Sequence, residues 1–252
     1  VRYCVLTTQR SGSTWFMSSL NAMPGIAGYM ELFLPHSPAR DPSWLVDPHP
    51  PGFYDWVRAG NTRLPRPIAT RAYLNWMLGF TAAASAVGFK LMINQGLRYY
   101  PEVLPLLRAQ GYRIIVLTRD PLELAISRYV AQQTRISHLA RPTALAPVAI
   151  DPAWFRHDVR RRLLEYRLAR GVLRALGFRA HWLDYKDLQT DTPGALGDCA
   201  AFLDCPDAAA GQSSPMVKVL DKPYADLITN YDALQAIARE IYGRQAKEAR
   251  AD

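Results

Sequence analysis

Continuous runs of apolar and β-branched residues mark the strands that this sequence predicts. The runs at 3–8 and 113–118 have the pattern of strands buried on both faces of a parallel sheet. Shorter runs predict further strands at 26–30, 86–92 and 180–183. Between the runs, apolar residues at helical spacing predict helices from about 13 to 23, over 68–84, 101–111, 122–135 and 151–177, and in segments that begin at 192 and near the C-terminus.

The alternation of strands and helices along the whole chain predicts the fold class. It indicates a three-layer α/β fold with a mostly parallel central sheet, in which ligands bind beyond the carboxyl ends of the strands. We expect one domain over residues 1–252. Its proline-rich segment at about 35–67 is expected to be irregular. That segment is either a lid or substrate loop, or a surface loop anchored by its aromatic residues.

Composition and charge narrow the class of partner. The 252 residues include 49% hydrophobic side chains, and Lys and Arg outnumber Asp and Glu by 30 to 22, a net charge of +8. This charge favours anionic partners, among them phosphates, nucleic acid and acidic lipid. Three cysteines without metal-ligand spacing predict no metal site and a reducing, cytoplasmic location. No apolar stretch approaches the ~20 residues of a membrane span, and a removed leader or anchor stays open.

The segment that links the first strand to the first helix has the composition of an anion site. It carries Arg10, Gly12 and two serines directly before a helix N-terminus. Backbone N–H groups and the positive end of the helix dipole at such a terminus attract phosphate or sulfate. The nucleoside-triphosphate loop needs an earlier glycine and a lysine, both missing here. The alternative is a polar turn capped by Ser11 or Ser13.

Residues 8–15, TQRSGSTW, resemble the 5′-phosphosulfate-binding loop of sulfotransferases. The family's second signature, a strand ending in Arg, often followed by Asp-Pro, with Ser eight residues after the Arg, is matched by Arg119 and Ser127. The chain looks closest to the bacterial carbohydrate-type group that contains trehalose sulfotransferase and the nodulation-factor enzymes. The resemblance implies a P-loop-like architecture and the donor 3′-phosphoadenosine 5′-phosphosulfate (PAPS). The donor ligands that it implies are Arg10, Ser11, Gly12, Ser13, Thr14 and Trp15 at the loop, with Arg119, Ser127 and Lys218.

Sulfuryl transfer to a hydroxyl needs a proton acceptor and cations at the leaving phosphate. Arg10 is expected to stabilise the leaving group, and Glu31, which follows the second strand, is the expected base, with His36 in reserve. Lys90 interrupts a buried strand, so it either reaches the sulfuryl group or snorkels at the sheet end. Trp15 either flanks the adenine or packs in the helix core.

Several alternatives accompany this interpretation. Without the resemblance, Arg119 would be read as the partner of Asp120 in a local ion pair, Ser127 as a helix-surface hydroxyl and Glu31 as a solvated carboxylate. The competing functions are a nucleotide kinase or other phosphoryl transferase, and a noncatalytic binder of nucleic acid or polyanions. The expected acceptor is a hydroxyl of a carbohydrate, glycolipid or secondary metabolite, with no nucleic acid as partner. The oligomeric state is open.

Overall fold

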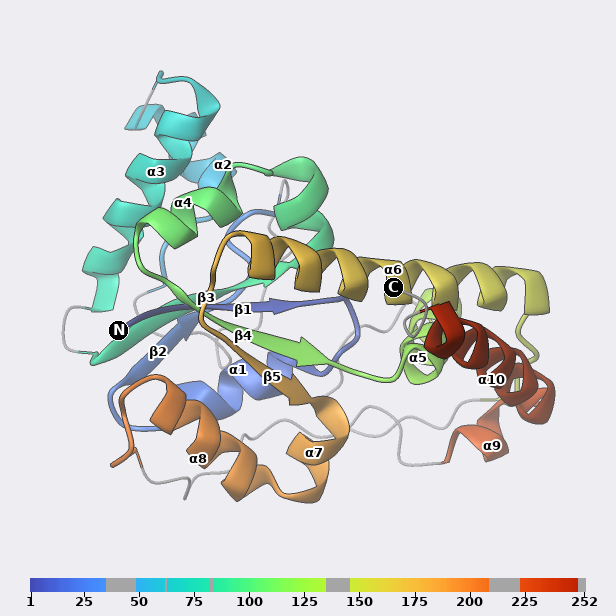
Figure 1. Cartoon of the computed structure of the whole chain (residues 1–252). Helices are drawn as coiled ribbons and strands as arrows, with labels where there is room; N and C mark the ends of the chain where they lie inside the picture. The colour runs from blue at the N-terminus through green and yellow to red at the C-terminus, as the bar shows by residue number, and fades with distance from the viewer. Residues whose placement is uncertain (35–48, 62, 82–83, 135–145, 209–222, 249–252) are drawn as a thin grey trace. The chain divides into compact units, whose positions relative to one another are not determined.

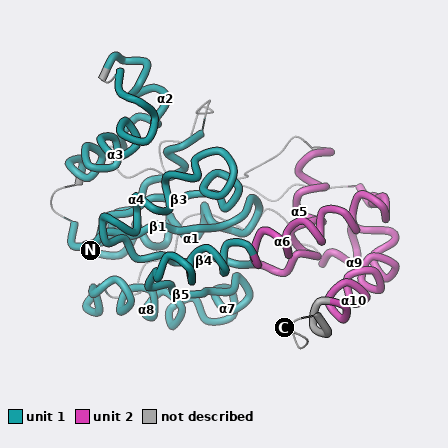
Figure 2. The backbone as a smooth tube through the Cα atoms, turned by 45° about the horizontal axis from the view of Figure 1, so that its top comes forward, with its two compact units in different colours: residues 1–118, 168–215 teal, residues 119–167, 216–252 magenta. Residues whose placement is uncertain are grey.

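The computed structural model of this chain describes residues 1–34, 49–61, 63–81, 84–134, 146–208 and 223–248. The chain forms two compact units (Figure 2). The first contains Val1–Thr118 and Leu168–Pro215, and the second contains Arg119–Arg167 and Met216–Asp252. One domain over residues 1–252 therefore stays a prediction.

A five-stranded, fully parallel sheet forms the centre of the first unit (Figure 1). Its strands lie in the order β2-β3-β1-β4-β5. In the central strand, Val5 pairs with Lys90 on one side and with Ile115 on the other. The strands are β1 (Arg2–Thr7), β2 (Ile26–Tyr29), β3 (Ala86–Met92), β4 (Arg113–Thr118) and β5 (Ala180–Asp184). The expected fold class, a three-layer α/β fold with a parallel sheet, is confirmed.

Helices cover both faces of this sheet. Helices α1, α7 and α8 lie on one face, whereas α2, α3 and α4 lie on the other (Figure 1). The helical elements of the first unit are α1 (Ser13–Asn21), α2 (Phe53–Trp56), η2 (Val57–Asn61), α3 (Arg66–Met77), η3 (Leu78–Thr81), η4 (Gln95–Tyr99), α4 (Val103–Ala109), the end of α6 (Pro152–Ala175), α7 (Tyr185–Thr190) and α8 (Thr192–Phe202).

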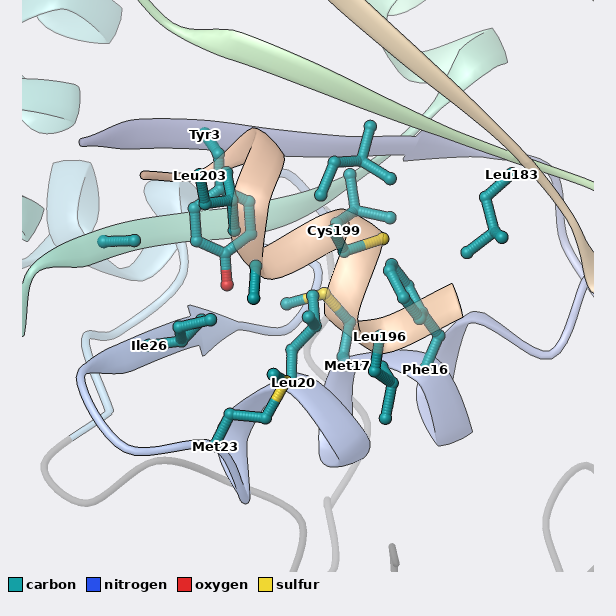
Figure 3. Close-up of a cluster of buried hydrophobic side chains, with 14 of the residues drawn as sticks. Tyr3, Phe16, Met17, Leu20, Met23, Ile26, Leu183, Leu196, Cys199 and Leu203 are labelled. Atoms are coloured by element: carbon teal, nitrogen blue, oxygen red, sulfur yellow. The ribbon is translucent and has the colours of Figure 1, made fainter. Parts of the chain in front are cut away.

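The core between the sheet and helices α1 and α8 is closely packed (Figure 3). Phe16 and Leu20 of α1 meet Leu196 and Cys199 of α8 beneath the strands. Burial raises the pKa of the Cys199 thiol to about 12, so the thiol stays protonated and acts as a small hydrophobe. All three cysteines are free and buried.

The second unit is helical. It consists of α5 (Pro121–Thr134), residues 152–167 of α6, α9 (Tyr224–Leu227) and α10 (Tyr231–Glu248). Its apolar core includes Ile126, Phe155 and Leu234. Beside this core, the buried carboxylate of Asp158 accepts from Arg128 at 2.5 Å. A buried charge needs such a partner, so this ion pair fixes α5 against α6 within the unit.

Two features of the fold differ from the sequence prediction. Helix α7 was missed: its six residues are too few to show a helical period, and it begins where the Asp184 carboxylate accepts from the Lys186 N–H at 2.8 Å. The segment at 35–67 was expected to be irregular, but it contains α2 and η2 where the structure describes it. Phe53 makes an edge contact with Tyr73 of α3, with ring centres 5.5 Å apart, which gives this short helix its packing surface.

Leu20→Ala should destabilise the fold by about 2–5 kcal/mol, because it opens a cavity between α1 and α8. Urea denaturation followed by circular dichroism measures the change. Ile68→Ala is the matched control, since Ile68 is 52% exposed on α3 and should lose about 0.5 kcal/mol or less. Equal losses in the two variants would contradict the packing described.

Candidate functional site

The loop between β1 and α1 is held tightly at the carboxyl end of the central strand. The Thr7 hydroxyl donates to the Leu117 carbonyl of β4 at 2.9 Å, and the Ser11 hydroxyl lies 2.6 Å from the Thr7 oxygen. Since the Thr7 proton is used by Leu117, Ser11 donates to Thr7. Arg10 and Gly12 have φ angles of +70° and +84°, in the left-handed region. The loop therefore turns sharply twice before the helix starts.

The N-terminus of α1 is open to an anion. Gly12 is its N-cap residue, no side chain accepts from its first N–H groups, and its first turn contains no acidic residue. The alternative in which Ser11 or Ser13 caps the helix is therefore wrong. Helix N–H groups without a side-chain acceptor, at the positive end of the dipole, make a site for phosphate or sulfate.

Tyr185 of α7 forms one wall of this loop. A Cβ added to Gly12 would collide with the Tyr185 ring, so only glycine fits at this position. The same ring makes an edge contact with Trp15, with ring centres 6.0 Å apart. Trp15 also packs against the core beside α1, which is the helix-core alternative. Its contact with an adenine stays a prediction.

Sequence reasoning missed Tyr185. The signal was available, because Tyr185 directly follows β5 and ligand-binding residues of parallel sheets gather beyond the carboxyl ends of the strands.

Lys90 connects the candidate base to the anion loop. Its ammonium lies 3.1 Å from the Glu31 Oε1 and donates to the Thr14 hydroxyl at 3.5 Å. The side chains of Lys90 and Glu31 are only 5% and 16% exposed. Snorkelling of Lys90 is therefore wrong, and so is a solvated Glu31. The ends of β2 and β3 and the first turn of α1 place these three groups together.

In the second unit, Arg119 is buried and follows β4 directly in the chain. Its Nη2 lies 2.9 Å from the Glu123 carboxylate and donates to the Tyr224 hydroxyl at 2.8 Å. The alternative, a local ion pair of Arg119 with Asp120, is wrong. Asp120 instead accepts from the Leu122 N–H at 2.9 Å and from the Tyr242 hydroxyl, because it caps the start of α5. Burial and this hydrogen bond raise the pKa of Tyr242.

Ser127 lies on α5, eight residues after Arg119 in the chain. It is 6% exposed on α5, so the alternative of a surface hydroxyl is wrong. Arg119 precedes α5, whereas Glu123 and Ser127 lie four residues apart on it, the spacing that places side chains on one face of a helix. Because Glu123 also pairs with Arg119, an anion that binds Arg119 must compete with the Glu123 carboxylate.

Two expected site residues, His36 and Lys218, lie outside the described residues. Among the residues that the structure describes, no group of three His, Cys, Asp or Glu side chains could hold a metal ion. No described helix is both long and apolar enough to cross a membrane.

Comparison with solved structures supports the fold. The chain is similar to the sulfotransferase domain from the Synechococcus PCC 7002 olefin synthase, with a TM-score of 0.50 and 15% identity over 96% of this chain and 94% of that domain. The described chain has the fold of that domain. A sulfotransferase from Alicyclobacillus acidocaldarius matches with a TM-score of 0.45 and 12% identity, over 96% of this chain and 95% of that one.

The mouse sulfotransferase SULT7A1, complexed with PAP, matches with a TM-score of 0.42 and 14% identity, over 91% of this chain and 63% of that one. The fold assignment rests on the olefin synthase domain, because the other two scores fall below 0.5. No family model matches the sequence, and no curated protein matches it significantly.

Gly12→Ala should destabilise the protein by at least about 1 kcal/mol, because alanine is strained at this positive φ and its Cβ meets Tyr185. Thermal unfolding followed by circular dichroism measures the loss. Gly197→Ala is the control: Gly197 lies inside α8 with open space around it, so alanine should stabilise that helix by about 0.5–1 kcal/mol. Stabilisation by both variants would contradict the tight turn at Gly12.

Proposed function

We propose that this chain is a sulfotransferase that moves the sulfuryl group of PAPS to an acceptor hydroxyl. The observation that carries the proposal is the arrangement at the carboxyl edge of the sheet, where an uncapped helix N-terminus adjoins a buried Lys90–Glu31 pair. The helix terminus suits an anion, and the carboxylate suits a proton. An enzyme that transfers an anionic group to a hydroxyl needs both.

The loop fits the phosphosulfate end of the donor. Gly12 admits the Tyr185 ring against the loop, and the N–H groups of Ser13 and Thr14 lie in the uncapped first turn of α1. Arg10 adds a permanent charge to this loop. For the 3′-phosphate we keep Arg119 and Ser127, as the resemblance implies. Both side chains are buried, Arg119 just before α5 and Ser127 on it, as ligands of a specific phosphate would be.

The chemistry assigned to this chain is positioning and proton transfer. The acceptor oxygen attacks sulfur, the bond from sulfur to the bridging phosphate oxygen breaks, and the acceptor proton passes to the Glu31 carboxylate. Lys90 keeps that carboxylate in place before the reaction, since its ammonium is 3.1 Å away. Arg10 and the helix N–H groups stabilise the charge that develops on the leaving phosphate. Such fixed dipoles supply most of the catalysis in comparable group transfers.

The acceptor is proposed as a hydroxyl of a carbohydrate, glycolipid or secondary metabolite. Its support is the aromatic segment that follows the proline-rich stretch, in which Phe53, Tyr54 and Trp56 lie among further rings. Of these rings, Tyr54 is partly exposed and suits contact with a sugar or a flat scaffold, whereas Phe53 and Trp56 are buried and support it. The three free cysteines fit a reducing compartment, the cytoplasm in this proposal.

Arg10→Ala and Arg119→Ala should each weaken binding of adenosine 3′,5′-bisphosphate about tenfold or more, because each removes a charged hydrogen bond worth about 1.5–3 kcal/mol. Isothermal titration calorimetry measures the affinity, and the exposed Arg71→Ala serves as the control with equal loss of charge.

The 2′,5′ isomer of the nucleotide should bind more weakly to the unchanged protein. Unchanged nucleotide affinity in both Arg variants would contradict the proposed donor site. Equal affinity for both isomers with a steep salt dependence would instead indicate a polyanion binder.

Glu31→Gln should fold, bind the nucleotide and lose turnover by about 10²-fold or more, because the amide still accepts from Lys90 but takes up no proton. Transfer of label from ³⁵S-PAPS to a panel of cell extracts measures turnover. Glu102→Gln is the control, since Glu102, whose side chain is 12% exposed, also pairs with a cation of the same unit, Arg66, at 2.9 Å.

Near-normal turnover of Glu31→Gln would assign the base to His36 or to the substrate itself. Label transfer that requires Mg²⁺ and ATP in place of PAPS would support the phosphoryl-transferase alternative.

A further inference from the structure

A cationic pocket lies at the opposite edge of the sheet from the candidate site. Its volume is about 270 Å³, and it is lined by Arg108, Gly111, Tyr112, Arg113, Gly177 and Arg179. These residues come from the end of α4, the start of β4 and the turn before β5. All of them belong to the first unit, and they sit at the amino ends of β4 and β5.

The backbone that shapes the pocket is fixed. Gly111 and Gly177 have φ angles of +74° and +65°, and each ends the helix before its strand. The Ile114 N–H donates to the Arg179 carbonyl at 3.1 Å, which continues the pairing of β4 with the turn before β5. The two turns therefore hold Arg113 and Arg179 side by side at the sheet edge.

The three guanidinium groups differ in how many of their N–H groups already donate to other residues of the protein. Arg113 donates to the Phe202 carbonyl at 2.6 Å and to the Asp204 carboxylate at 2.5 Å. This pairing raises the pKa of Arg113 and lowers that of Asp204. Arg108 donates through Nε to the Leu176 carbonyl at 2.9 Å. Arg113 is therefore neutralised, whereas Arg108 keeps its terminal nitrogens.

Arg179 supplies the remaining charge. Its guanidinium carbon lies 5.4 Å from the centre of the Phe202 ring, and its charge helps to lower the pKa of the nearby Asp204. Among the described residues, no hydrogen bond or ion pair within 4 Å is formed by its side chain. The ring orients the guanidinium without consuming any N–H group. Three cations thus line the pocket, the Asp204 carboxylate binds one of them, Arg113, and the aromatic face of Phe202 holds Arg179.

We propose that this pocket binds a small organic phosphate or sulfate monoester. Arg108 and Arg179 would bind the anionic head, because guanidinium groups match the geometry of phosphate and sulfate oxygens. The pocket volume of about 270 Å³ is close to the lower end, about 300 Å³, of pockets that bind small organic ligands, so a small organic body beside the anion is in range. This site is separate from the loop at Arg10 and is independent of the proposed function.

Isothermal titration with glucose 6-phosphate, glucose 6-sulfate, inorganic phosphate and glucose tests the proposal. Both esters should bind, glucose should not, and Arg179→Gln should weaken ester binding about tenfold or more, because one charged hydrogen bond is worth about 1.5–3 kcal/mol. Arg71→Gln, an exposed arginine on α3, should leave it unchanged. If only the sulfate ester binds, the ligand is a sulfated compound. If only the phosphate ester binds, it is a phosphorylated one.

The same titrations in the Arg10→Ala variant separate this pocket from the loop. Ester binding should persist there, whatever happens to the nucleotide. Loss of ester binding in Arg10→Ala, or equal binding in Arg179→Gln and the unchanged protein, would overturn the proposal. If Arg71→Gln weakened ester binding as much as Arg179→Gln does, the loss would reflect net charge alone and the proposal would fail. Equal affinity for inorganic phosphate and for the esters would exclude a site that recognises esters.

Discussion

The buried ion pair between Lys90 and Glu31 is the interaction on which the arrangement at the carboxyl edge depends. An ammonium group taken out of water costs several kcal/mol unless a charge partner and hydrogen bonds replace the solvent. Glu31 at 3.1 Å and Thr14 at 3.5 Å are those partners here. Since Lys90 belongs to β3, Glu31 follows β2 and Thr14 begins α1, one charged group links three segments that are distant in the chain. Breaking the pair would leave a buried charge, so the three segments are held in one geometry.

Backbone strain at the neighbouring loop is held by the same strand ends. A left-handed conformation costs a residue with a Cβ about 1–2 kcal/mol, and Arg10 adopts it. The hydrogen bonds of Thr7 to Ser11 and Leu117, together with the Tyr185 ring against Gly12, restrict the loop enough to maintain this conformation. Strain of this kind is typical of sites that fix dipoles in advance. Helix N–H groups held in this way need no rearrangement when an anion binds.

The strands and most helices could be predicted from the sequence because each carries its own periodic pattern. The runs at 86–92 and 113–118 coincide with β3 and β4, since strands buried on both faces of a parallel sheet need continuous apolar residues. Long-range contacts carry no such pattern. Whether Lys90 points to Glu31 or to solvent depends on the register of β3 with β1 and β2, which no local sequence shows. For Arg119 the sequence did contain a signal for its partner. Glu123 at i+4 is spaced to reach Arg119, whereas Asp120 at i+1 points elsewhere.

The net charge of +8 indicated anionic partners, but it could not show where they would bind. The structure places cations at both edges of one sheet, with Arg10 and Lys90 at the carboxyl edge and Arg108, Arg113 and Arg179 at the amino edge. At each edge a carboxylate, Glu31 or Asp204, pairs with one of these cations. A surface that only attracted polyanions would need no such pairing, because its affinity grows with every added charge. Cations that are paired with carboxylates in this way instead suit small ligands of defined charge.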